Sequence, residues 1–342
     1  MFRYSLSRIL LFSITLWLLS IFTFALNYWY PGDPLTNMSG VVGEMTTAYQ
    51  QESINRAMDS TIFRQYGQYI AHLVEGNWGI SLSTQEPVFT AMRHHLGASL
   101  ELIILGSAVA IVLGLPLGTY AALRQRQWQD KLIMTLSLST YSIPVFWFAQ
   151  LAILLFAIQL GWSPIAGQIH PLYAIETQTG SILLDIILSD VEYRGAAFIN
   201  ALQHLWLPTL VVALIPLTML IRMIRSAVLD TLQLNHIKAA RVRGLSDTTI
   251  LFKHVLPTAI QPVLREAGLQ FSVLVTNIII VEVVFNWPGL GGWLVKSIFE
   301  RDYPVLQGGL LCLAMLILVA NFTIDLLHAW RYPQTRDVID AD

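Results

Sequence analysis

The chain has 342 residues, of which 55% are hydrophobic and only 12% are charged, and its formal net charge is −2. A soluble globular protein carries about twice that charged fraction, so the composition excludes a soluble enzyme and a disordered chain. The balanced charge offers no basic field for nucleic acid, and the single cysteine, Cys312, excludes an internal disulfide and a cysteine-based metal cage.

Six apolar stretches are long enough to cross a bilayer as helices of about 20 residues, which predicts an all-α integral membrane protein. In chain order they are 9–26, 99–123, 132–160, 204–221, 267–285 and 305–330. The first has the basic start of a signal peptide, but no small-residue cleavage site follows it, so we interpret it as a retained anchor helix. The run 182–188 is too short to span and contains Asp185, so we interpret it as an amphipathic segment or part of a folded loop.

These stretches divide the chain into four regions. They are an N-terminal anchor helix (1–26), an outer loop region (27–98), a five-helix core (99–330) and a tail (331–342). Six spans place both termini on one side of the membrane, and most of the 20 lysines and arginines then lie on that side. The positive-inside rule therefore predicts that both termini are cytoplasmic.

The outer segments are rich in aromatic side chains. The region 27–98 is predicted to be partly helical around 54–75. The segments 63–81 and 287–292 are expected to be ordered, because aromatic side chains can pack them on one another or on the outer ends of the spans. These side chains are Tyr66, Tyr69, Trp78, Trp287 and Trp293. Within the second span, Gly114 and Gly118 form a small-xxx-small pair that favours close helix packing.

The longest inner loop, 222–265, is basic and has the pattern of two helices joined at a glycine. The first helix is predicted over 230–243, and Gly244 comes next, where a C-terminal cap favours a residue without a Cβ. Ser246 is a typical N-cap for a second helix that runs up to Pro257, and this proline is expected to disturb the helix beyond it. The charge alone fits a solvated basic loop that obeys the positive-inside rule, but the spacing is more specific.

The run Lys238-Ala239-Ala240, three residues, Gly244, nine residues, His254, then Leu256-Pro257 resembles the "EAA" loop of ABC importer membrane subunits. Two positions depart from that pattern, since Lys238 replaces a glutamate and His254 replaces an isoleucine. In that family the loop docks into a groove of the ATP-hydrolysing subunit. The resemblance thus assigns ATPase coupling to Lys238, Ala239, Ala240, Arg241, Gly244, Leu245, Leu256 and Pro257.

Other stretches resemble the dipeptide and oligopeptide permeases of this family. They are Pro31-Gly32-Asp33-Pro34, Gly76-Asn77-Trp78-Gly79-Ile80-Ser81, Ser142-Ile143-Pro144-Val145-Phe146-Trp147 and Glu282–Gly291. Within that branch, 160–164 and 185–200 look most like the Sap type. The resemblance covers nearly the whole chain.

The resemblance implies a type I ABC importer permease fold with six spans in the bacterial inner membrane. It implies a subunit that moves peptides by ATP-driven alternating access, with antimicrobial peptides or polyamines as further cargo of the Sap type. The expected partners are a second homologous permease, two ATP-binding subunits, a periplasmic solute-binding protein and membrane lipid. No cofactor is expected in this chain, because ATP and Mg would bind to the partner ATPase subunits.

Two sets of polar residues in the spans have a structural and a functional interpretation. Glu282 either bonds to the turn after it or lies at the mouth of the translocation path, where an acid would attract cationic substrate. With it, the resemblance suggests a periplasmic gate formed by Trp287, Pro288, Gly289 and Gly291. Asn321 and Asp325 share one helix face, and they form either a buried polar pair satisfied by neighbouring helices or a proton or cation relay. The absence of a basic partner in the spans favours the polar pair.

The alternative to a transporter is an integral-membrane enzyme that acts on lipid or peptide. Such an enzyme needs catalytic polar groups at a membrane interface. The sequence shows no serine–histidine–aspartate pattern, no HExxH motif and no paired intramembrane acids, which favours a transporter.

Overall fold

The computed structural model describes residues 2–43 and 46–331, and its regular elements are helices together with one isolated bridge between Ile80 and Pro87. The N-terminal helices are α1 (Phe2–Trp29), α2 (Pro34–Ser39), α3 (Thr47–Asn55) and α4 (Ile62–Val74). The central elements are α5 (Val88–Leu123), α6 (Trp128–Ser142), α7 (Val145–Ala152), the π-helix η1 (Ile153–Gln159), the 3₁₀ turn η2 (Pro171–Tyr173) and α8 (Ile182–Leu188). The C-terminal elements are α9 (Arg194–Leu232), α10 (Asn235–Val242), α11 (Asp247–Ile250), the π-helix η3 (Leu251–Val255), α12 (Leu256–Val284), α13 (Leu290–Glu300) and α14 (Tyr303–Arg331). The predicted tail lies outside the described residues, except for Arg331.

Five helices within the described residues are long and apolar enough to cross a membrane. They are Arg8–Trp29, Val88–Leu123, Arg194–Leu232, Asp247–Val284 and Tyr303–Arg331. Each covers one of the predicted spans, so five of the six are found as continuous helices. The helices extend beyond the predicted apolar runs, because polar residues prolong them outside the hydrophobic region.

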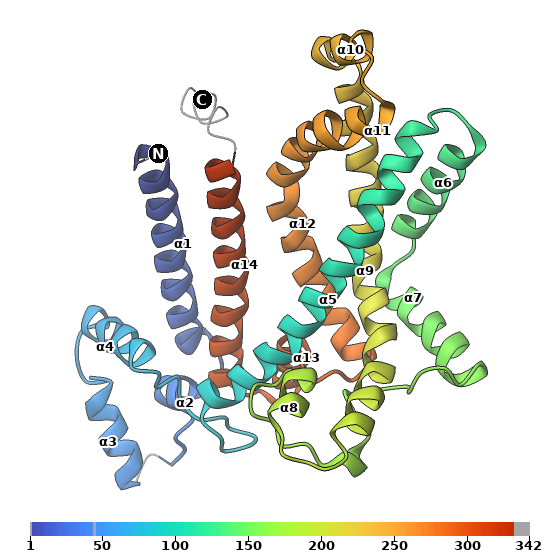
Figure 1. Ribbon diagram of the computed structural model, residues 1–342. Helices are drawn as coiled ribbons and strands as arrows, with labels where there is room; N and C mark the ends of the chain where they lie inside the picture. Colours follow the sequence, from blue (N-terminus) through green and yellow to red (C-terminus); the bar gives the residue numbers. More distant parts are fainter. Residues whose placement is uncertain (1, 44–45, 332–342) are drawn as a thin grey trace.

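The third predicted span, 132–160, is not one continuous helix. It consists of Trp128–Ser142 and Val145–Gln159, which meet at an angle of 103°. The cause is Pro144: the residue before a proline avoids the helical region, and Ile143 is extended with ψ of 127°. In Figure 1, α5 ends and α9 begins at opposite ends of the molecule, so the bent pair carries the chain back between them.

The first turns of α1 and the last turns of α14 lie at the same end of the molecule as α10 (Figure 1). The short helices α2, α8 and α13 lie at the opposite end. An even number of crossings is required for this arrangement, which agrees with six spans when the bent pair counts as one. The end that carries α10 is called the inner end below, and the opposite one the outer end.

The long helices α5 and α9 form the most extensive helix pair. A Cβ on Gly118 of α5 would lie 2.7 Å from the carbonyl oxygen of Ile221 and 2.9 Å from Cβ of Ile224 in α9. A Cβ on Gly114 would lie 2.9 Å from a methyl carbon of Leu220. The predicted small-xxx-small pair therefore does allow close approach of two membrane helices.

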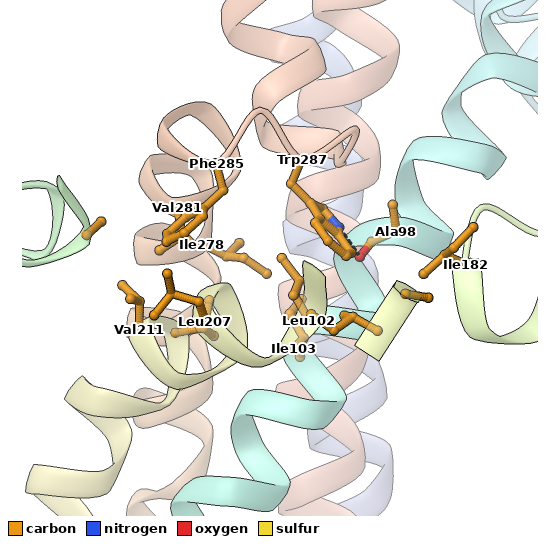
Figure 2. Close-up of a cluster of buried hydrophobic side chains, with 14 of the residues drawn as sticks. Ala98, Leu102, Ile103, Ile182, Leu207, Val211, Ile278, Val281, Phe285 and Trp287 are labelled. Atoms are coloured by element: carbon orange, nitrogen blue, oxygen red, sulfur yellow. Dashed lines mark hydrogen bonds between the residues drawn. The ribbon is translucent and has the colours of Figure 1, made fainter. Parts of the chain in front are cut away.

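The largest buried cluster lies toward the outer end, where α5, α9 and α12 meet. Figure 2 shows Trp287 pointing to Ala98 of α5, while Phe285 points toward Leu207 and Val211 of α9. These two aromatic side chains come directly after α12. The cluster thus fixes the end of α12 against both neighbouring spans.

The outer loop region packs on the spans through aromatic side chains, as predicted. Tyr66 and Tyr69 of α4 contact Phe24 of α1, with ring centroids 5.5 and 5.4 Å apart. The hydroxyl of Tyr69 donates to Thr23 Oγ1 at 3.0 Å, and burial raises the pKa of Tyr69 to about 12. Trp78 lies in a second cluster with Trp293. The region 54–75 is partly helical, as predicted, because α4 occupies residues 62–74, whereas α3 ends at Asn55.

Candidate functional site

The inner loop forms a short helix, α10, that projects beyond the ends of the long helices (Figure 1). Its side chains Ile237 and Ala240 are buried in a cluster with Ile224 and Val228 of α9 and Val255 of η3. Because Ile237 and Ala240 are three residues apart, they share one helix face. One face of α10 is therefore anchored to the spans, and the opposite face is exposed.

The predicted first helix, 230–243, is divided. Residues 230–232 complete α9, and α10 begins at Asn235 after a short turn. Sequence reasoning misses this turn, since it contains neither glycine nor proline. The division matters because it lets α10 leave the direction of α9 and lie across the inner end.

Gly244 forms the predicted elbow between α10 and α11. Its φ is +80°, and a Cβ there would meet nothing within 4 Å, so backbone conformation alone favours glycine. Ser246 is the N-cap of α11, and its hydroxyl accepts from the backbone N–H of Thr249 at 3.3 Å. Across the elbow, Arg241 and Asp247 lie 3.7 Å apart as an exposed ion pair. The elbow is thus held by local bonds on both sides.

The predicted coupling residues differ in exposure. Lys238, Ala239, Arg241, Gly244, Leu245 and Pro257 are exposed, whereas Ala240 and Leu256 are buried. The buried pair belongs to the cluster that anchors α10, so these two residues support the loop rather than reach outward. Val242, which the motif does not single out, is 88% exposed on a short helix. An apolar side chain with that exposure is a further candidate for a partner contact.

The second helix of the loop does not end at residue 256. It continues from α11 through the π-helix η3 into α12 as one helix, Asp247–Val284. Pro257 lies in the first turn of α12, directly after the π-helix, so the widened turn accommodates a residue that has no N–H. The expected disturbance at Pro257 is therefore a local change of helix type and not a break.

At the outer end, Glu282 is fully buried, with 0% of its surface exposed. Its carboxylate accepts from Ser99 Oγ of α5 at 2.5 Å and from the backbone N–H of Gly292 at 2.9 Å. The hydroxyl of Ser99 also accepts from the backbone N–H of Leu290 at 2.7 Å. The bond from Gly292 to Glu282 agrees with the structural interpretation, in which the acid bonds to the turn that follows it. The second partner, Ser99, is not indicated by the sequence.

The turn after Glu282, residues 286–292, has little space for larger side chains. A Cβ on Gly289 would lie 2.2 Å from the Glu282 carboxyl carbon, so this turn closes directly over the acid. The indole N–H of Trp287 donates to the carbonyl of Ala98 at 3.1 Å, and a ring nitrogen of His95 lies 2.8 Å from the carbonyl of Pro288. We call this set of bonds between the turn, α5 and α12 the outer network.

Two further buried acids at the outer end fix loops to the spans. Glu101 of α5 accepts from Ser181 Oγ at 2.7 Å and from the backbone N–H of Leu183 at 3.0 Å, at the start of α8. Asp302 accepts from Ser81 Oγ at 2.5 Å and Ser83 Oγ at 3.0 Å. The only sequence signal for Glu101 is a carboxylate in an apolar stretch, and its partner lies far away in the chain.

Ion pairs link the helices toward the inner end. Asp130 of α6 bonds to two guanidinium nitrogens of Arg225 in α9, at 2.6 and 2.8 Å. Asp325 lies 3.2 Å from a guanidinium nitrogen of Arg8 in α1. Arg8 lies just before the first predicted span, so the expectation that the spans hold no basic partner for Asp325 stands. The acid is nevertheless only partly buried and is paired with a neighbouring helix from outside the span.

Comparison with known proteins identifies the family. A family described as "Binding-protein-dependent transport system inner membrane component" matches residues 114–337, and the family of its N-terminal part matches residues 1–103. The chain belongs to this family. It is therefore a membrane permease component and not an enzyme, so the alternative of an integral-membrane enzyme is not supported.

This permease is similar to curated relatives over nearly its full length. It is 39% identical to the di/tripeptide transport system permease protein DppB of Pseudomonas aeruginosa, over 93% of this chain and 94% of that one. It is 37% identical to the dipeptide permease DppB of Haemophilus influenzae, over 98% and 100%. It is 34% identical to the putrescine export system permease protein SapB of Escherichia coli K12, over 97% of each chain. The branch is confirmed, and both the dipeptide and the Sap type are among its relatives.

Proposed function

We propose that this permease moves short peptides across the inner membrane as one half of a paired translocation unit. A second homologous permease completes the path, two ATP-binding subunits attach at the inner end, and a solute-binding protein delivers cargo at the outer end. ATP and Mg bind to the ATP-binding subunits. The observation that carries the proposal is the likeness, over nearly the whole chain, to permeases named for dipeptide and tripeptide transport.

The exposed face of α10 is the proposed contact with an ATP-binding subunit. A coupling element must be rigid to transmit a displacement, and α10 is anchored by its buried face and by the elbow at Gly244. The exposed residues Lys238, Ala239, Arg241 and Leu245 then form the contact surface, and Ala240 and Leu256 support it from beneath. Alternating access results if closure of the ATP-binding subunits moves this loop and the spans attached to it.

In this arrangement both chain termini are cytoplasmic, and the outer end faces the periplasm. The bias of lysines and arginines toward the inner end supports this orientation. Glu282 with Trp287, Pro288, Gly289 and Gly291 then lies at the periplasmic end. We propose that the outer network is closed in the conformation described and that it contributes to a periplasmic gate.

The experiment that tests the proposal is transport by the complete system. The permease, its partner permease, both ATP-binding subunits and the binding protein are expressed in cells that lack their own peptide permeases, and uptake of a radiolabelled dipeptide is measured. ATP-dependent uptake that requires this chain supports the proposal. Putrescine is the second candidate cargo, because one relative is named for putrescine export. Putrescine movement without dipeptide uptake would overturn the assignment to peptides.

A further inference from the structure

An apolar groove lies between α1, α4 and α14, toward the outer end of the molecule, and nothing in the proposed function accounts for it. Its volume is about 700 Å³. Its walls are formed by side chains such as Leu16 and Trp17 of α1, Ile70 and Leu73 of α4, and Leu311 and Met315 of α14. The polar groups at its edge are already paired, since Ser20 Oγ and Tyr66 Oη lie 2.7 Å apart.

The groove reaches the depth of the hydrocarbon core. The exposed Trp29 at the end of α1 and the stacked pair Tyr30 and Tyr303 are aromatic side chains of the kind that mark a membrane interface. From these residues, Ser20 and Met315 lie about 13–18 Å deeper at a rise of 1.5 Å per residue. Each leaflet contributes about 15 Å to the hydrocarbon core of the bilayer. The walls on α1 and α14 therefore run alongside the acyl chains of the outer leaflet.

Helix α4 has the pattern of a helix that lies in a membrane interface. Phe63, Gly67, Ile70 and Val74 recur at helical spacing and form one stripe, in which Phe63 and Val74 are each 84% exposed. The adjacent stripe carries Arg64, Gln68 and Glu75. An apolar face of this kind beside a polar one is typical of helices embedded at the boundary of headgroups and acyl chains.

We propose that this groove holds an acyl chain of an outer-leaflet phospholipid, with α4 embedded beside it at the boundary of headgroups and acyl chains. The choice of occupant rests on continuity with the lipid-facing surface, because Leu10, Leu18 and Phe22 make the exposed face of α1 apolar along the membrane. The bound lipid fills the space between the outer loop region and the first span. It thereby completes the support on which α4 rests.

Gly67 provides a direct test, because it lines the groove and a Cβ there meets nothing within 4 Å. The replacement Gly67→Leu thus adds a side chain to the groove without a clash inside the protein. Gly195 in α9 is the matched control, since it is also helical, exposed and without a neighbour within 4 Å. Gly67→Ala is an intermediate variant with a smaller added volume.

The assembled transporter is reconstituted in vesicles of phosphatidylethanolamine and phosphatidylglycerol that contain a phospholipid with a photoreactive group at the end of one acyl chain. After illumination, adducts are mapped by mass spectrometry. We expect adducts on Ile70 or Leu73, a severalfold loss of them in Gly67→Leu, a smaller loss in Gly67→Ala and no change in Gly195→Leu. Adducts at Leu18, an exposed residue of α1 at the depth of the acyl-chain ends, serve as the reference, because a misfolded variant would change those as well.

Two results would overturn the proposal. The first is labelling at Leu18 with none on α4 in the assembled transporter, which would mean that acyl chains do not enter the groove. The second is labelling on α4 that appears only when the partner permease and the binding protein are left out, which would make the groove a protein interface.

Discussion

The elbow at Gly244 permits a test in which backbone strain is separated from side-chain contacts. Gly244 has a φ of +80°, and a side chain there would meet no neighbour within 4 Å. The replacement Gly244→Val therefore changes only the backbone preference at the elbow. Since Ile237 and Ala240 still anchor α10, the strain is expressed as a change in direction between α10 and α11.

The size of the effect is set by the left-handed conformation. An L-residue in that region costs about 1–2 kcal/mol relative to glycine, and a branched side chain is at the upper end. If docking of the ATP-binding subunit requires the present geometry, the association weakens by this amount, which corresponds to a factor of about 5–30. Gly244→Asn should restore much of the loss, because asparagine visits the left-handed region more readily.

The assay is co-purification and binding of the ATP-binding subunit to permease pairs in detergent, with peptide uptake measured afterwards. The control is Gly76→Val, since Gly76 has a φ of +82° and also lacks a neighbour within 4 Å, but lies in the outer loop region. We expect Gly244→Val to insert and pair normally, to bind the ATPase weakly and to lose transport, while Gly76→Val keeps ATPase binding. Equal binding of the ATPase by both variants would refute the assignment of this elbow to coupling.

Three further predictions concern the spans, the outer network and the orientation. Gly118→Leu should lower the free energy of unfolding of the permease by about 1–3 kcal/mol through overpacking against Ile221, whereas Gly195→Leu should not. Equal melting temperatures of both variants would contradict the close packing of α5 on α9. Glu282→Gln removes one of the two carboxylate acceptors, which should lower the stability of the outer network by about 1–3 kcal/mol and speed proteolysis of the outer turn. A transport defect confined to cationic peptides would instead favour a direct role of Glu282 in attracting cargo. Reporter fusions at the C-terminus and near Thr84 should report opposite sides of the membrane, and the same side for both would exclude six crossings.

The features that can be predicted from sequence are those encoded locally. An apolar run long enough to span a bilayer is visible in one window, and five of the predicted spans are continuous helices. The elbow is equally local, because a glycine with a serine and an aspartate shortly after it specifies a helix end and a new helix start within four residues. Gly244 and Ser246 occupy the predicted conformations in the structure.

Proline is harder to interpret, since its effect depends on the residues around it. Pro116, Pro208 and Pro216 lie inside continuous helices, whereas Pro144 separates two helices that meet at 103°. In a membrane helix the backbone groups freed by a proline can find other partners, so the residue alone does not decide between a kink and a break. The sequence contains no local signal that distinguishes Pro144 from the others.

The polar bonds at the outer end could not be predicted, because each joins residues far apart in the chain. Ser99 and Glu282 are separated by 183 positions, and Ser81 and Asp302 by 221. An acid in an apolar stretch indicates that a partner exists, but the partner is chosen by the packing of α5 against α12 and α14. The same reason explains why the sequence does not pair Arg8 with Asp325.

The continuous helix from Asp247 to Val284 connects the two candidate sites physically. It begins three residues after Gly244, beneath α10, and it carries Glu282 near its outer end, where Ser99 holds the acid to α5. A displacement of the elbow that α10 transmits must therefore either bend this helix or strain the bonds of the outer network. Pro262 offers a point of bending, since a proline within a helix removes one backbone bond. If the helix moves as a rigid body instead, release of Glu282 from Ser99 becomes the step that opens the outer end when the inner end closes.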